Sequence, residues 1–197
     1  GFSGTDCGNG GNNGDGGTDG DPCFAGKSIV TRADGASVRI DTLKEGDEIM
    51  AATADGSLTT GVLSLLSIAH PEADVDNFLT LTTAANASVT LTHEHHLPVG
   101  AACCSTLKKA KEVSVGEHVW FVEQGKAATT TVVTKTVTKA KGLYSPVLTN
   151  GAFPIVDGII TSFDSIEKVM LAKYGLASLV AMCKASGTCD TMRDLFK

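Results

Sequence analysis

The fold is most constrained by a series of short runs of β-branched and aromatic residues that recur from residue 28 to residue 161. Turn-forming sequences such as Asp34-Gly35, Asp55-Gly56 and Asn150-Gly151 separate the runs. Short strands broken by such turns are typical of β-sandwiches and β-barrels. The sequence therefore predicts an all-β domain over residues 23–163. The predicted strands are 28–32, 37–40, 48–51, 59–68, 77–82, 88–92, 117–122, 129–138 and 153–161.

Two stretches of the chain share one pattern, which indicates an internal duplication. Thr42-Leu-Lys-Glu-Gly-Asp-Glu-Ile-Met50 resembles Glu112-Val-Ser-Val-Gly-Glu-His-Val-Trp120. A threonine-rich run follows each of them, at 59–63 and at 129–133. A duplicated unit predicts a pseudo-two-fold arrangement. Chance similarity between turn-flanked strands is the alternative.

The two ends of the chain differ from this middle part. Residues 1–22 are mostly Gly, Asn and Asp, with almost nothing to bury, so we expect a flexible linker. Asp and Gly alternate over residues 15–21, which leaves a calcium loop as the alternative. After residue 163, apolar residues recur at helical spacing behind an N-cap pattern, Asp164 with Glu167. We expect a helical tail over 164–197.

Charge and hydropathy exclude some classes of partner. The formal net charge of −6 argues against nucleic acid, because phosphate binders normally carry a basic face. The apolar runs are interrupted well short of the roughly 20 residues that cross a bilayer, so we expect no transmembrane segment. The basic run 108–111 is predicted to be a solvated face. We also expect a monomer without a cofactor.

The six cysteines do not follow the spacing of a small disulfide-rich scaffold. Cys183 and Cys189 could close a small loop, whereas the adjacent Cys103 and Cys104 are not expected to bridge each other, because neighbours seldom do. Zinc bound by this adjacent pair and the histidines of 93–96 is an alternative. No HExxH pattern is present and no spaced ligand pair stands out, so we expect no metal site.

Two places carry candidate chemistry. Cys23 stands where the glycine-rich stretch ends and a foldable sequence begins. In 89–99, a β-type run leads directly into three histidines and a glutamate. We expect these places to meet, with Cys23 as a nucleophile and with Thr92 and His95 assisting it. A buried apolar cysteine, a core histidine and an ordinary strand threonine are the structural alternatives.

Five short motifs follow one another in the chain. They are Cys23-Phe-Ala-Gly26, Leu43-Lys-Glu-Gly-Asp-Glu-Ile49, Leu91-Thr-His-Glu-His-His-Leu97, Val115-Gly-Glu-His-Val119 and Tyr144-Ser-Pro-Val-Leu-Thr-Asn-Gly151. Together they resemble the Hint domain of hedgehog-type autoprocessing proteins, which is shared with inteins. The resemblance covers about residues 23–163. It implies a duplicated, horseshoe-like all-β fold and cleavage of the protein's own chain.

The resemblance also implies roles for single residues. Cys23 would attack the carbonyl of Pro22 in an N-to-S acyl shift, which turns the amide between them into a thioester. The family's Thr-x-x-His motif matches Thr92 and His95, and an imidazole that titrates near neutrality suits protonation of the leaving nitrogen. The acidic residue that activates the sterol in this family has no counterpart here. His70 is the titratable group nearest to that place, so we assign the role to it, with a loop at a strand end as the alternative.

The thioester would be resolved by an external nucleophile: a sterol or other alcohol, water, or a thiol. The upstream segment, the protein's own substrate, would then be released with Pro22 at its end. The terminal Asn and following nucleophile of inteins are missing, so splicing is not expected. The family and the linker composition imply the secretory pathway or the extracellular space. The alternative function is a non-enzymatic extracellular β module with a calcium-binding linker.

Overall fold

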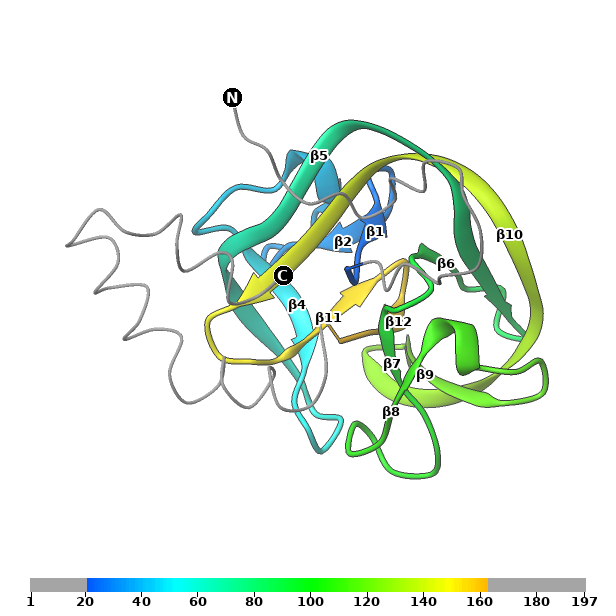
Figure 1. Ribbon diagram of the computed structural model, residues 1–197. Helices are drawn as coiled ribbons and strands as arrows, with labels where there is room; N and C mark the ends of the chain where they lie inside the picture. The colour runs from blue at the N-terminus through cyan, green and yellow to red at the C-terminus, as the bar shows by residue number, and fades with distance from the viewer. Residues whose placement is uncertain (1–20, 163–197) are drawn as a thin grey trace.

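The computed structural model describes residues 21–162, and these residues form an almost entirely β structure (Figure 1). The all-β prediction is confirmed, with two short 3-10 helices as the only helical elements of the described part. The strands are β1 (Phe24–Ala25), β2 (Ile29–Thr31), β3 (Ser37–Arg39), β4 (Glu48–Ala52), β5 (Leu58–Thr83), β6 (Ser88–Leu91), β7 (His96–Pro98), β8 (Leu107–Lys109), β9 (His118–Glu123), β10 (Lys126–Leu148), β11 (Phe153–Val156) and β12 (Ile159–Ile160), and the 3-10 helices are η1 (Ile40–Thr42) and η2 (Ala110–Glu112).

Several predictions of the sequence fall on residues outside this range. They are the linker and calcium loop, apart from Asp21 and Pro22, the helical tail over 164–197, and the pairing of Cys183 with Cys189. Within 21–162, no helix has the length and apolar character needed to cross a membrane.

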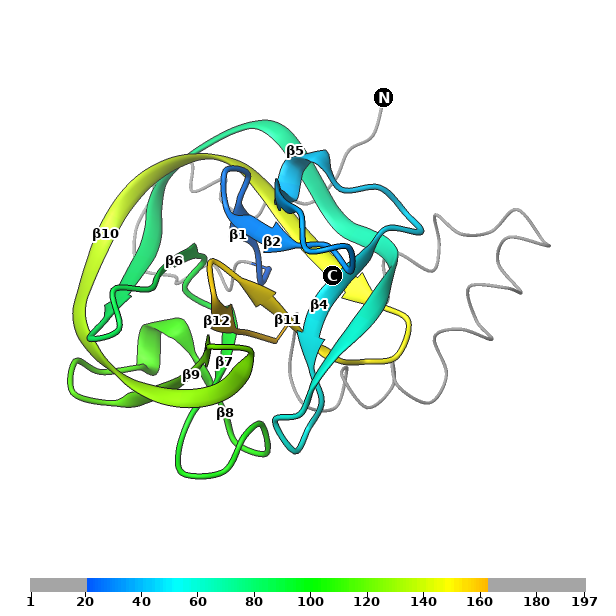
Figure 2. The same ribbon diagram turned by 180° about the vertical axis from the view of Figure 1, so that it is seen from behind.

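The molecule is organised around two long strands, β5 and β10, which curve side by side and pair antiparallel (Figures 1 and 2). They belong to a ten-stranded sheet in the order β12-β9-β10-β1-β6-β5-β4-β11-β2-β3, in which β5 and β10 also pair directly with each other. The remaining two strands, β7 and β8, form a separate hairpin.

The sequence predicted separate strands at 59–68 and 77–82, and this prediction is wrong because β5 continues through His70 and Pro71. The ladder with β10 pairs His70 with Leu143 and then Asp74 with Lys141, so residues 71–73 fall in a register shift. A proline has no N–H to donate to a ladder and is tolerated where pairing is interrupted. Pro71 therefore marks an irregularity of the strand and not its end.

The predicted duplication is visible in two matching turns. Gly46 donates its N–H to the Leu63 carbonyl at 2.9 Å, and Gly116 donates to the Val132 carbonyl at 2.8 Å. Both glycines have φ of 92°. The first turn lies between η1 and β4 and contacts β5, whereas the second lies between η2 and β9 and contacts β10. The two halves therefore repeat one unit, as the pseudo-two-fold prediction requires.

The buried side chains gather in three clusters. The largest lies between the two halves and includes Phe24, Ile49, Leu91 and Val119. A second is built around Cys103, Cys104 and residues of β11 and β12. The third, which we call the Cys23 cluster, comprises Cys23, Ala25, Ile68, Val75, Phe78 and Leu143.

Cys103 and Cys104 form a disulfide with each other, so the expectation that these neighbours do not bridge is wrong. They lie in the turn between β7 and β8, where the Cys104 N–H donates to the Ala54 carbonyl at 2.8 Å. Sequence adjacency gave no sign of this pairing, since most adjacent cysteines cannot reach the required geometry.

Candidate functional site

The junction between Pro22 and Cys23 lies at the entrance to a central strand. β1 follows it directly, and β1 pairs antiparallel with β10 on one side and with β6 on the other. Phe24 faces Tyr144 across one ladder and Leu91 across the other. Cys23 is fully buried, and the sheet holds the chain directly downstream of the junction.

Thr92 holds this junction with three hydrogen bonds. Its Oγ1 accepts the N–H of Cys23 at 2.9 Å and donates to the carbonyl of Asp21 at 3.0 Å. Its own N–H donates to the Cys23 carbonyl at 2.9 Å. Thr92 comes directly after β6, so the pairing of β6 with β1 sets its position. A single threonine thus contacts the backbone on both sides of the Pro22–Cys23 peptide.

His95 lies in the loop between β6 and β7 and is completely buried. Its ring packs on the ring of Phe24, with centroids 4.0 Å apart and planes tilted by 56°. Burial and, to a lesser degree, the nearby charge of His96 lower the pKa of His95 to about 3, although the backbone of Ser162 opposes this shift. At neutral pH the imidazole is therefore uncharged.

Neither ring nitrogen of His95 has a hydrogen-bond partner of normal geometry. The imidazole therefore does not hydrogen-bond the Cys23 sulfur in this structure, although it packs on the very next residue, Phe24. The Cys23 side chain packs in the Cys23 cluster, whereas Phe24 belongs to the largest core cluster. The structure thus brings Cys23, Thr92 and His95 close together. Thr92 contacts Cys23 directly, whereas His95 contacts the next residue, Phe24.

The Cys23 sulfur is disulfide-bonded in this structure. A nucleophilic attack needs a thiolate. Reduction of this bond must therefore come before any chemistry at Cys23.

His70 is partly exposed and lies on β5, opposite Leu143 of β10. Leu143 also pairs with Ala25 on its other side, so β10 separates His70 from β1. The structure has no hydrogen bond between His70 and Cys23, Thr92 or His95. His70 is therefore a neighbour of the Cys23 cluster and not part of the Thr92–His95 contact.

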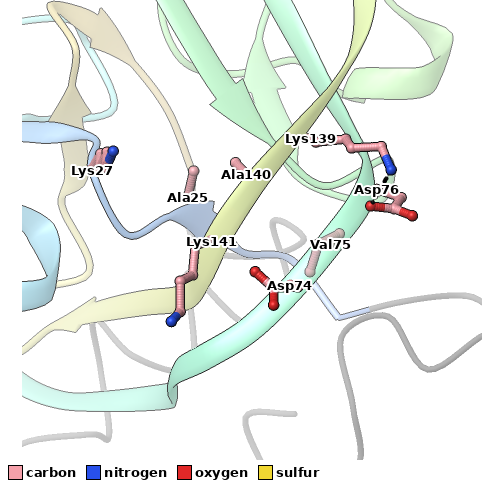
Figure 3. A pocket seen from close by; sticks show the side chains of 8 residues that line it. All are labelled: Ala25, Lys27, Asp74, Val75, Asp76, Lys139, Ala140 and Lys141. Atoms are coloured by element: carbon pink, nitrogen blue, oxygen red, sulfur yellow. Dashed lines mark ion pairs between the residues drawn. The ribbon is translucent and has the colours of Figure 1, made fainter.

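A cavity of about 420 Å³ opens where β1, β5 and β10 meet (Figure 3). Ala25 and Val75 line it and also belong to the Cys23 cluster. Its other lining side chains are mostly charged, and Asp76 forms an ion pair with Lys139 at 3.0 Å. The remaining lining residues are Lys27, Asp74, Ala140 and Lys141.

The sequence left open whether Glu94 orients His95 or faces solvent, and it did not predict the lysine partners of this residue, which is buried. Its carboxylate forms ion pairs with Lys109, at 2.6 Å, and with Lys111. Burial raises the pKa of Glu94, but hydrogen bonds from the two lysines outweigh burial and lower it below the ordinary value. The sequence predicted the basic run 108–111 to be a solvated face, and this prediction is wrong for two of its lysines. Lys109 and Lys111 form ion pairs with the Glu94 carboxylate. A glutamate flanked by histidines gave no sign of a distant lysine partner.

The residues of 21–162 contain no group of three metal-ligating side chains. Cys103 and Cys104 are bonded to each other and are not available as thiolate ligands in this structure. The zinc alternative therefore finds no support in the described part of the chain.

Comparison with known proteins identifies the family. A family model described as the Hint module matches residues 15–193. Among curated proteins, the chain is 24% identical to the zebrafish (Danio rerio) Indian hedgehog B protein over 187 residues, which are 87% of this chain and 44% of that protein. It is 30% identical to the zebrafish Tiggy-winkle hedgehog protein over 168 residues, or 82% of this chain and 40% of that protein. The chain thus spans less than half the length of these relatives.

Solved structures agree at the level of fold. The DnaB intein from Synechocystis sp. PCC 6803 superposes with a TM-score of 0.63 at 19% identity, covering 74% of this chain and all of that one. A bacterial intein-like domain from Clostridium thermocellum gives a TM-score of 0.58 at 16% identity, covering 71% and 96%. The match to the Hint module and the hedgehog similarity support self-processing as the general class of activity. The chain belongs to the Hint-module family and is similar in sequence to hedgehog proteins and in fold to inteins.

Proposed function

We propose that this chain cleaves itself between Pro22 and Cys23 by an N-to-S acyl shift. The observation that carries the proposal is the bridge made by Thr92, whose hydroxyl accepts the Cys23 N–H and donates to the Asp21 carbonyl. The peptide that would break is therefore fixed on both sides. Holding reacting groups in this way can lower a barrier by several kcal/mol, with effective molarities of roughly 10⁵ M or more.

The acyl shift needs no external proton. The Cys23 thiol loses its proton, its sulfur bonds to the Pro22 carbonyl carbon, and the bond from that carbon to the Cys23 nitrogen breaks. The departing nitrogen takes up one proton, so that the thiol proton is recovered on the amine. His95 carries this proton: it begins neutral, as its burial favours, becomes protonated during the attack and then protonates the nitrogen.

This role differs from the one that an ordinary histidine would play. With a pKa of about 3 the resting imidazole cannot supply a proton at pH 7. It must first accept one, and the positive charge that forms is costly in a buried site. A rotation of the ring toward the Cys23 nitrogen would use its unpartnered nitrogens. Thr92 meanwhile holds that nitrogen and orients it for proton transfer.

In the second step an acceptor attacks the thioester carbonyl and the Cys23 thiol leaves. The cavity in Figure 3 supports an approach from the side of β1, β5 and β10, since two residues of the Cys23 cluster line it. His70 would accept the proton of the incoming hydroxyl, amine or thiol. Its place on β5 beside Leu143 lies near this approach. The acceptor is a small nucleophile: a sterol, another alcohol, water or a thiol. We place the protein in the secretory pathway or outside the cell.

Trapping the thioester tests the first step. A reporter domain is fused ahead of Gly1, the Cys23 disulfide is reduced with a phosphine, and cleavage is followed after adding hydroxylamine. The proposal expects cleavage that depends on hydroxylamine and is lost in Cys23→Ala. Equal cleavage of this variant, or none in either protein, would rule the proposal out.

His70→Ala separates the two steps. If His70 activates the acceptor, the variant forms the thioester at the normal rate but transfers the acyl group to water or an alcohol about 10²-fold more slowly. Hydroxylamine needs no base at pH 7, so it should still cleave the variant. His118→Ala is the matched control, because His118 is exposed at the start of β9. Transfer by His70→Ala at the normal rate would remove His70 from the mechanism.

A further inference from the structure

The loop that carries His95 is fixed to the second half of the molecule by a buried carboxylate. Glu94 is 8% exposed, and ion pairs join it to Lys109 at the end of β8 and to Lys111 in η2. Bringing a carboxylate out of water is costly unless it is paired, and here two cations pair with it. The Glu94 contact, as we call these two ion pairs, therefore has to form for the loop to pack.

Two backbone hydrogen bonds extend the same attachment. The Ala110 N–H donates to the His95 carbonyl at 2.7 Å, and the Lys111 N–H donates to the His93 carbonyl at 3.0 Å. The residues on both sides of Glu94 are therefore bound to η2 through their backbones, while Glu94 is bound through its side chain. Three consecutive residues thus dock on one short segment.

The His95 ring has no comparable attachment of its own. Both of its nitrogens lack a hydrogen bond of normal geometry, and its ring contact is with Phe24. Its position must therefore be set by packing and by the backbone of the loop. A shift of the loop would move the imidazole relative to the Cys23 nitrogen, and a displacement of about 1 Å can cost 10²-fold in rate.

We propose that Glu94 is a positioning residue for self-cleavage: its carboxylate, bound by Lys109 and Lys111, holds the loop so that the His95 ring stays against Phe24 and can reach the Cys23 nitrogen by rotation. This inference rests on the proposed function. It assigns a role to a residue between Thr92 and His95 in the Thr-x-x-His motif, and it makes the basic run 108–111 part of what supports the active site.

The variant Glu94→Gln tests this, because it keeps the shape of the side chain and removes its charge. Glu117→Gln is the matched control: Glu117 binds Lys108 of the same hairpin at 2.7 Å but does not contact the His95 loop. Both proteins carry the upstream reporter, and hydroxylamine-dependent cleavage is timed after reduction. We expect Glu94→Gln to be about 10- to 100-fold slower and Glu117→Gln to stay within about threefold of the wild type.

A second measurement separates positioning from a loss of fold. The titration of the His95 ring is followed by NMR in the Cys23→Ala background, in which the chain stays intact. The titratable group next to this ring is His96, the first residue of β7, and the facing segment carries Lys109 and Lys111, which pair with Glu94. Loosening of the loop admits water, so the pKa of His95 should rise toward its ordinary value in Glu94→Gln and should not change in Glu117→Gln.

If Glu94→Gln fails to fold, Lys111→Gln removes one of the two cations and gives the milder test, with slower cleavage expected. Cleavage at the wild-type rate with an unchanged His95 titration would overturn the inference, as would equal slowing in Glu117→Gln. A wild-type protein that does not cleave would instead overturn the proposed function, and the His95 titration would still show whether Glu94 holds the loop.

Discussion

At the scale of single residues, the site depends on two side chains with unlike tasks. Thr92 is fully engaged and makes hydrogen bonds to residues 21 and 23. His95 is buried with both ring nitrogens unengaged. The first arrangement orients the peptide for attack, and the second leaves a proton carrier ready to act. Each can be tested by one substitution.

Thr92→Val keeps the branched shape of the side chain and removes its hydroxyl. We expect hydroxylamine-dependent cleavage to slow about 10²-fold, the usual cost of losing one well-placed hydrogen-bonding group. Thr90→Val is the control, because Thr90 lies on β6, two residues before Thr92, and its hydroxyl bonds to Thr80, away from Cys23. Timed gels of the two variants check this. Similar rates for both would show that the Thr92 hydroxyl has no special part.

Burial of His95 also predicts how stability changes with pH. Its folded pKa, about 3, lies below the ordinary value of 6.5, so the unfolded chain binds more protons between these values. The contribution of His95 to the free energy of unfolding is therefore fully present above pH 6.5. It is lost as the pH falls toward 3, and it amounts to roughly a few kcal/mol.

Urea unfolding of Cys23→Ala at several pH values measures this effect. Between pH 6.5 and 5 the free energy of unfolding should fall, and it should fall much less when His95→Asn is added, since carboxylates such as Glu94 titrate mainly at lower pH. An equal slope in both proteins would mean that His95 is not the group responsible.

At the scale of secondary-structure elements, the repeated turns before β4 and β9 explain why the sequence contains its echo. Gly46 and Gly116 occupy the same position of the repeat, each with φ of 92°, a conformation that side chains with a Cβ rarely adopt. Asp47 and Glu117 follow them, and each accepts a backbone N–H from three residues earlier, at 2.8 Å and 3.1 Å. The repeated pair of a glycine and an acidic residue is therefore explained by the geometry of the turn and not by the proposed chemistry.

Gly46→Ala and Gly116→Ala should therefore destabilise the fold by similar amounts, about 1–2 kcal/mol each. A Cβ at either position would meet no atom within 4 Å, so the cost is that of the backbone conformation alone. Val115→Ala, at a neighbouring exposed position, should change stability by less than about 0.5 kcal/mol. Denaturant unfolding measures all three. Unequal costs for the two glycines would argue against equivalent turns.

The same scale shows what sequence patterns could and could not predict. Alternating apolar residues and turn glycines predicted most strands, because both act locally. The continuity of β5 through Pro71 could not be predicted, since it depends on how β10 pairs around the interruption. The short strands β1, β7 and β8 also carry too few residues for a periodic pattern and exist through their partners.

At the scale of the whole molecule, the duplication builds the site between its halves. β1 lies between β10 of the second half and β6 of the first, and the His95 loop docks on η2 of the second half. The candidate residues Cys23, Thr92 and His95 could be named from the sequence because their motifs are local. The lysine partners of Glu94 could not be predicted, since only the fold brings them to it.

The most direct test of this account is the mass of the two fragments released from a reduced precursor that carries a reporter ahead of Gly1. After treatment with hydroxylamine, the account predicts an upstream fragment that ends at Pro22 as its hydroxamate and a downstream fragment that begins at Cys23. An uncut precursor under these conditions, or a cut at any other peptide bond, would contradict it.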